Sequence, residues 1–359
     1  MVRELGMLVA LVAVCAAIYL SNDVFLGPTN VSNTSIEIAR LGIFAIGVAF
    51  VIITGGIDLS VGSMITLTGV LVAKISSEQS GGLGYPIWIG VTVAFVVALV
   101  FGYLQGTLIT RLGLQPFIVT LGGMLVFKGI ARVLTNNGTL SFGDSPLPAA
   151  MERTLLRVGD WTILSTPTLI LIIVVILATY LLHFTVFGRY LYAIGGGREA
   201  AEFSGIPVKR VETMAYVISA GLAALTGLVE TRLSSMTHTI GDTYELYAIA
   251  AAVIGGVSLR GGEGSIFGVL IGAAMLRVIY NGINLFKYVY FDAEGRQQEF
   301  RFESKWQELI IGAVILLSVS ADQIAHRLRA KRRARKPGAA QGAPPSSPSV
   351  LSEPTAGKG

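Results

Sequence analysis

The side chains that most often do chemistry are sparse in this sequence and form no catalytic pattern. The three histidines, His183, His238 and His326, lie far apart, and Cys15 is the one cysteine. No H-E-x-x-H metal motif, P-loop or G-x-S-x-G nucleophile elbow occurs. A single cysteine also excludes an intramolecular disulfide and a cysteine-based zinc site. The sequence therefore predicts neither an enzyme, nor a metal site, nor a cofactor held by this chain.

Two Gly-rich segments interrupt apolar runs and share the skeleton G-G-x-x-L-x-x-G, one at Thr54–Ser63 and one at Gly255–Ser265. Paired glycines release the backbone from a helix, which at membrane depth requires protein or water to satisfy the freed groups. Such breaks often mark gates or transport sites. A tight turn, with Asp58 or Ser60 capping the next helix, is the alternative. The gate candidates are Gly55, Gly56, Asp58, Ser60, Gly62, Gly255 and Gly256.

Polar side chains inside apolar runs form a second group of candidates. Asn281 and Asn284 lie at i and i+3, on one face of a helix that also carries Arg277. Such a face avoids lipid. These groups either contact the hydroxyls of a solute or join helices, and joining helices is the commoner use. The candidates for a translocation path are Gln115, Phe117, Thr120, Asn281 and Asn284.

Residues 195–210 form a polar stretch that predicts a short helix over 198–204, with Gly205 in the C-terminal capping position. Its surface mixes charge with alanine and Phe203, which suits docking onto another protein; a solvated loop helix is the alternative. The docking candidates are Arg198, Glu199, Ala200, Ala201, Phe203, Ser204, Gly205 and Ile206.

The composition identifies what positions these groups. Of the 359 residues 53% are hydrophobic and only 14% charged, against about 25% charged in soluble domains. We expect an all-α, polytopic membrane protein of about ten transmembrane helices. Their expected positions are residues 5–20, 38–54, 59–75, 87–110, 116–134, 168–185, 211–231, 245–258, 265–285 and 306–322. The segment 245–258 is short for a full span.

The basic residues predict the orientation and the domain division. Seven arginines and lysines between Arg327 and Lys336 directly follow the last expected span, so both termini should be cytoplasmic. The same rule places residues 186–210 in the cytoplasm. We expect a transmembrane domain over residues 1–325 and, over 326–359, a basic and then disordered tail rich in Pro, Ser, Ala and Gly.

Four ordered segments resemble the permease subunits of bacterial ATP-binding-cassette (ABC) importers of the ribose, xylose, rhamnose and galactose type. They are Gly55–Ser63, Gly113–Gly122, Glu199–Ile206 and Tyr244–Gly256, and the phrase Asn281–Leu285 extends the match. The resemblance covers about residues 35–325. The loop 287–305 is longer and more charged than this family leads us to expect, and the N-terminus is shorter.

The resemblance implies a vitamin-B12-importer-like permease fold of ten helices in the bacterial inner membrane. It implies that residues 198–206 are the coupling helix, which contacts a cytosolic ABC ATPase. That ATPase would bind the ATP and Mg²⁺ that this chain does not bind. The implied partners are this ATPase, a periplasmic sugar-binding protein, membrane lipid and a second permease chain, the same or similar; no nucleic acid is expected. The implied function is import of a monosaccharide.

Two other functions stay open at this stage. The first is a permease for a nucleoside or an autoinducer in the same superfamily, because few side chains determine the solute. The second is an ion-coupled secondary transporter, which would need carboxylates buried at mid-depth. Asp58, Glu230, Glu245 and Asp322 instead lie near the ends of expected spans, which argues against it.

Overall fold

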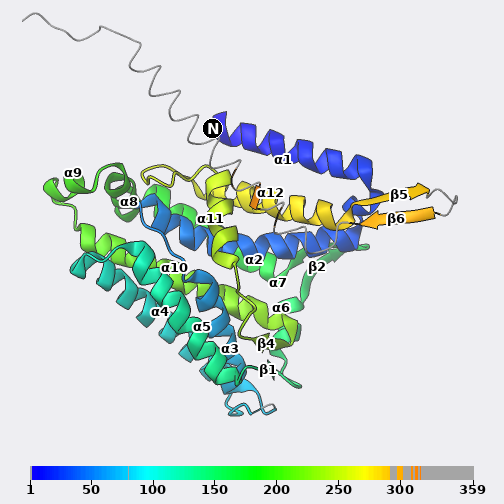
Figure 1. Ribbon diagram of the computed structural model, residues 1–359, viewed down its shortest axis with the longest axis horizontal. Helices are drawn as coiled ribbons and strands as arrows, with labels where there is room; N and C mark the ends of the chain where they lie inside the picture. Colours follow the sequence, from blue (N-terminus) through cyan, green and yellow to red (C-terminus); the bar gives the residue numbers. More distant parts are fainter. Residues whose placement is uncertain are drawn as a thin grey trace, which may run out of the picture. The chain divides into compact units, whose positions relative to one another are not determined.

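The computed structural model describes residues 2–79, 81–291, 297–301, 309, 312, 313 and 316, which all belong to one compact unit, Met1–Ser318 (Figure 1). Most of these residues are helical. The α-helices are α1 (Val2–Ser21), α2 (Pro28–Ile53), α3 (Val61–Ser76), α4 (Ile87–Leu112), α5 (Pro116–Thr135), α6 (Leu147–Glu152), α7 (Thr166–Thr179), α8 (Val186–Gly196), α9 (Arg198–Phe203), α10 (Val208–Glu230), α11 (Tyr244–Ile254) and α12 (Ile266–Leu285). Short helical turns are η1 (Asp23–Leu26), η2 (Tyr180–Phe184) and η3 (Thr231–Leu233).

Within the described ranges, seven helices are long and apolar enough to cross a membrane: α1, α2, α4, α5, α7 continued by η2, α10 continued by η3, and α12. Two apolar helices are shorter, α3 and α11. The structure therefore has a helix at nine of the ten predicted segments. The tenth, residues 306–322, lies almost wholly outside the described residues, as does the predicted tail.

Helix α2 is the centre of the packing and begins ten residues earlier than predicted. It packs against α7, α10, α11 and α12 (Figure 1), and every residue from Ala39 to Ile53 is buried. Pro28 occupies the first turn, where its fixed φ suits a helix and its missing N–H is not needed. The sequence analysis missed this start because it relied on apolar runs, and residues 28–37 are mostly polar.

Among the described residues, three two-stranded antiparallel sheets modify the all-α prediction. They pair β1 (Thr139–Ser141) with β4 (Ser235–Thr237), β2 (Thr154–Val158) with β3 (Trp161–Ser165), and β5 (Lys287–Phe291) with β6 (Gln297–Arg301). All lie in segments that the sequence analysis left as loops. The β1–β4 pair follows the C-terminal ends of α5 and α10, whereas α8 and α9 lie at the opposite end of α10 (Figure 1).

Candidate functional site

The turn between α2 and α3 holds a buried carboxylate. Gly55 has φ +87°, a conformation that L side chains rarely adopt. Asp58 is only 3% exposed and accepts hydrogen bonds from the backbone N and the Oγ of Ser60, at 2.9 and 2.7 Å, and from Ser219 Oγ on α10, at 2.7 Å. Hydrogen bonds of this kind stabilise a charge removed from water. Asp58 therefore holds the turn between α2 and α3 against α10.

The second Gly-rich segment, between α11 and α12, contacts the first. Gly256, Gly261 and Gly262 all have positive φ, and Gly262 N donates a hydrogen bond of 2.9 Å to Ile53 O at the end of α2. Gly195 of α8 lies against the same backbone, where a Cβ would clash with Ile53 O and Gly262 N. Two segments about 200 residues apart thus meet in one backbone contact beside α8.

Helix α9 follows α8 directly and covers 198–203, one residue shorter than predicted. Phe203 is 92% exposed, whereas Ala201 packs inward at 4%. Arg198 Nε donates a hydrogen bond of 2.9 Å to Glu212 on α10, and this bond raises the pKa of the Arg198 side chain. Gly205 has φ +78°, as its predicted capping position requires. The short helix is thus anchored to α10 and presents an aromatic ring to its surroundings.

A cleft of about 640 Å³ joins three of the predicted segments. Its walls come from the α2–α3 turn, the α4–α5 connection, α9 and the first turns of α10. They include Gly55, Gly56, Gly113, Gln115, Arg198, Glu202, Glu212 and Tyr216. Residues of α9 and of the Gly-rich α2–α3 turn thus line one shared cleft.

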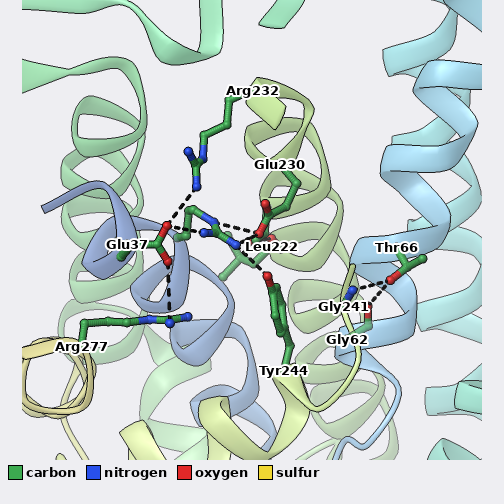
Figure 2. Close-up of polar contacts among 11 residues, drawn as sticks. Glu37, Gly62, Thr66, Leu222, Glu230, Arg232, Gly241, Tyr244 and Arg277 are labelled. Atoms are coloured by element: carbon green, nitrogen blue, oxygen red, sulfur yellow. Dashed lines mark hydrogen bonds and ion pairs between the residues drawn. The ribbon is translucent and has the colours of Figure 1, made fainter. Parts of the chain in front are cut away.

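A network of charged side chains lies between the helices and was missed by the sequence analysis. Arg40 of α2 forms an ion pair with Glu230 of α10 and donates to Tyr244 Oη of α11 at 2.7 Å. Figure 2 shows Glu37 of α2 between Arg232 and Arg277, with nitrogen–oxygen distances of 2.9 and 3.7 Å. Each carboxylate thus has an arginine counter-ion, as buried charges require.

Glu37 and its neighbour Arg40 change one premise of the sequence analysis, which had placed the carboxylates it considered near the ends of expected spans. Both lie inside the candidate span Pro28–Ile53, and Glu230 is fully buried. Permanent guanidinium partners occupy these carboxylates, unlike a site that binds and releases a cation. The i, i+3 spacing of Glu37 and Arg40 within α2 was the sequence signal that could have found them.

Close backbone packing joins α3 to the segment before α11. Gly241 N donates to Thr66 Oγ1 at 2.9 Å (Figure 2), and a Cβ on Gly62 would clash with Gly241 O and Glu245 Oε2. Lys128 of α5 pairs with Asp242 at 2.7 Å. Gly62, predicted as a gate residue, is therefore a close-packing position.

The five residues predicted for a translocation path fall into two separate groups. Gln115 precedes α5 and lines the cleft, Phe117 is half exposed, and Thr120 is fully buried. Asn281 exchanges hydrogen bonds of 2.8 and 3.0 Å with Asn30 of α2. It thus joins two helices, which was the alternative to contact with a solute. Asn284 is exposed. Helix α5 packs on α3 and α4, whereas α12 packs on α1, α2, α7 and α11, so one chain does not bring the two groups together.

No group of three His, Cys, Asp or Glu side chains in the described part of the chain is placed to hold a metal ion. What the structure does contain is seven candidate spans, ion pairs buried between them, and a cleft that joins Gly-rich turns to an exposed short helix. These features are those of a multi-pass membrane protein.

The chain matches the family described as branched-chain amino acid transport system / permease component over residues 30–319, and it belongs to that family. It is 35% identical to the ribose import permease protein RbsC of Escherichia coli K12, over 88% of this chain and 92% of that protein. Identity to the protein of the same name from Bacillus subtilis 168 is 35%, over 89% and 93%. The xylose transport system permease protein XylH of E. coli K12 is 32% identical, over 89% and 92%. No solved structure matches the chain.

Proposed function

We propose that this chain is the membrane-spanning permease subunit of an ABC importer that carries a monosaccharide into the cytoplasm. Relatives named for the import of ribose, xylose and fructose cover most of its length. The sequence has no P-loop, and we place ATP binding and hydrolysis, with Mg²⁺, on a partner ATPase. A binding protein on the outer side delivers the solute.

The single observation that carries this proposal is the position of α9. It presents Phe203 at 92% exposure and shares a cleft with the Gly-rich α2–α3 turn. Residues Arg198 to Ile206 are the proposed coupling helix. A partner that moves α9 acts on this turn and, through the Gly261–Gly262 backbone, on the α11–α12 connection. The turn and this connection form the proposed gate.

The proposed arrangement in the membrane follows from the span order. Ten spans, the tenth near residues 306–322, would put both termini and α9 on one side of the bacterial inner membrane, and the basic residues from Arg327 to Lys336 favour the cytoplasmic side. Two permease chains, identical or similar, would line the path between them. Gln115, Phe117 and Thr120 remain the proposed path residues near the gate. Asn281 and Asn284 are proposed to line a separate part of the path, on α12. The fold would then be that of the vitamin-B12-importer-like permeases.

The test is sugar uptake by proteoliposomes that contain the complete complex. Replacing Glu199 and Phe203 by Ala should lower both sugar-stimulated ATP hydrolysis and uptake while thermal stability is retained. Phe184→Ala is the matched control, because Phe184 is also exposed, at 71%, but lies outside α9. Unchanged hydrolysis and uptake in the α9 variant would refute the coupling role. Binding of radiolabelled ribose, xylose and fructose by the partner binding protein would identify the solute.

A further inference from the structure

Helices α4 and α10 pack unusually closely because α4 carries two glycines on the shared face. A Cβ on Gly102 would lie 2.7 Å from the Ala220 side chain, and one on Gly106 would lie 2.8 Å from Thr213 Cα. Small residues four positions apart let membrane helices approach in this way. The larger side chains beside this seam are thereby pushed to its edges and form the walls of a groove.

That groove has a volume of about 480 Å³ and is lined by residues of α4 and α10 alone. Helix α4 contributes Tyr103, Thr107 and Arg111, whose spacing of four places them in one row along the helix. Helix α10 contributes Lys209, Arg210, Thr213 and Met214. Both helices are candidate spans, and Tyr103 and Met214 in the groove are exposed on the surface of the chain.

The lining changes in order along this row. Tyr103 and Met214 are about half exposed and form the apolar end, at 48% and 46%. The Thr107 hydroxyl is buried with no hydrogen-bond partner and occupies the middle. Arg111 is at the other end of the groove, about 12 Å along the helix axis from Tyr103 at 1.5 Å per residue. The groove is thus apolar, then polar, then cationic.

The cationic end of the groove lies where α4 ends and α10 begins. Arg111 is in the last turn of α4, and Lys209 and Arg210 are in the first turn of α10. No carboxylate lines the groove, and within the described ranges none of the three cations forms an ion pair. Glu212, the nearest acidic residue on α10, is held by Arg198. Three positively charged residues therefore line the groove, and none is within ion-pair distance of a carboxylate in the described part of the chain.

We propose that the α4–α10 groove binds an anionic phospholipid. Arg111, Lys209 and Arg210 hold the headgroup phosphate, and an acyl chain lies along Thr107, Tyr103 and Met214. Basic pockets between transmembrane helices bind anionic headgroups in this way. A water-soluble phosphate would leave the apolar end unfilled, which favours a lipid. The proposal does not depend on the solute that is carried.

The test is lipid binding to the purified full-length chain, read by native mass spectrometry during titration with phosphatidylglycerol. Phosphatidylcholine should bind at least about ten-fold more weakly, and excess inorganic phosphate should not displace the bound phosphatidylglycerol. The triple variant R111Q/K209Q/R210Q should bind phosphatidylglycerol on the order of 100-fold more weakly, since each basic residue near a lipid surface changes affinity about five-fold. The readout is binding, because Arg111 and Lys209 also border the cleft near α9.

Two further variants separate the groove from general charge attraction. K331Q/R332Q/R333Q removes the same charge from the C-terminal tail and should bind like the wild type. T107F fills the groove without changing the charge and should lose binding about ten-fold or more. Wild-type binding by the groove triple variant or by T107F would overturn the proposal. Equal loss in the tail variant, or displacement by inorganic phosphate alone, would also overturn it.

Discussion

At the scale of single residues, the structure is defined by charges that have been removed from both water and lipid. Arg40 and Glu230 have side chains 7% and 0% exposed, and they join α2 to α10. Removing one partner of a buried ion pair leaves an uncompensated charge, whereas removing both is often nearly neutral. The pair therefore contributes mainly by constraining which helices meet.

The Arg40–Glu230 pair predicts strong non-additivity. Arg40→Gln and Glu230→Gln should each destabilise the protein, by about 3–5 kcal/mol, and the double variant should be less destabilised than either single variant. Thermal unfolding in detergent measures this cycle, with Arg40→Lys as the variant that keeps the charge. Additive single effects would show that the two side chains do not interact.

Asp58 predicts a difference between two substitutions of one residue. Asp58→Ala leaves the Ser60 and Ser219 donors without their acceptor, at a cost of about 1–3 kcal/mol for a buried group. Asp58→Asn keeps an acceptor oxygen and should be the milder variant, both in thermal stability and in uptake by the complete complex. Equal stability of wild type and Asp58→Ala would contradict the anchoring role.

The sequence reveals such residues only in part. Asp58 was found because it lies two residues after the Gly55–Gly56 pair, a local pattern. Its partner Ser219 lies 161 residues away, and Arg40 and Glu230 are 190 apart. A single sequence carries no information about pairings of this range. Glu37 was also overlooked because the apolar run was taken to begin at residue 38, whereas Arg40 lies inside that run and was not singled out.

At the scale of elements, helices were predictable because span length and apolar composition are set by the bilayer. The β1–β4 pair was not, since its strands are three residues long and come from connections that follow different helices. The short helix α11 has a physical basis for its length: it ends at Ile254, where the glycines begin. The positions of these glycines therefore determine where the apolar helix ends.

In the Gly-rich α2–α3 turn, the effect of one substitution should be partly reversed by a second. A Cβ on Gly56 would lie 2.6 Å from the Tyr216 hydroxyl oxygen, so Gly56→Ala should lower both stability and ATP-driven uptake. Adding Tyr216→Phe removes that oxygen and should restore part of the loss. Gly129→Ala is the control, because no heavy atom lies within 4 Å of a Cβ there. A Gly56→Ala variant with wild-type uptake would show that this contact does not matter for transport.

At the scale of the whole molecule, the account requires α9 to face the cytoplasm. The lone Cys15 makes this testable, because a Cys15→Ser chain has no other thiol. Phe203→Cys in that background should react with a membrane-impermeant maleimide in inside-out vesicles and not in intact spheroplasts. Labelling in spheroplasts alone would reverse the orientation and remove the contact with a cytosolic ATPase.

The central claim is that a cytosolic ATPase moves this chain, and uptake into proteoliposomes measures it most directly. With the binding protein and labelled sugar outside, accumulation should require both the ATPase subunit and ATP inside, and should persist when ion gradients are collapsed. Accumulation against a gradient by the permease chain without an ATPase would contradict the account.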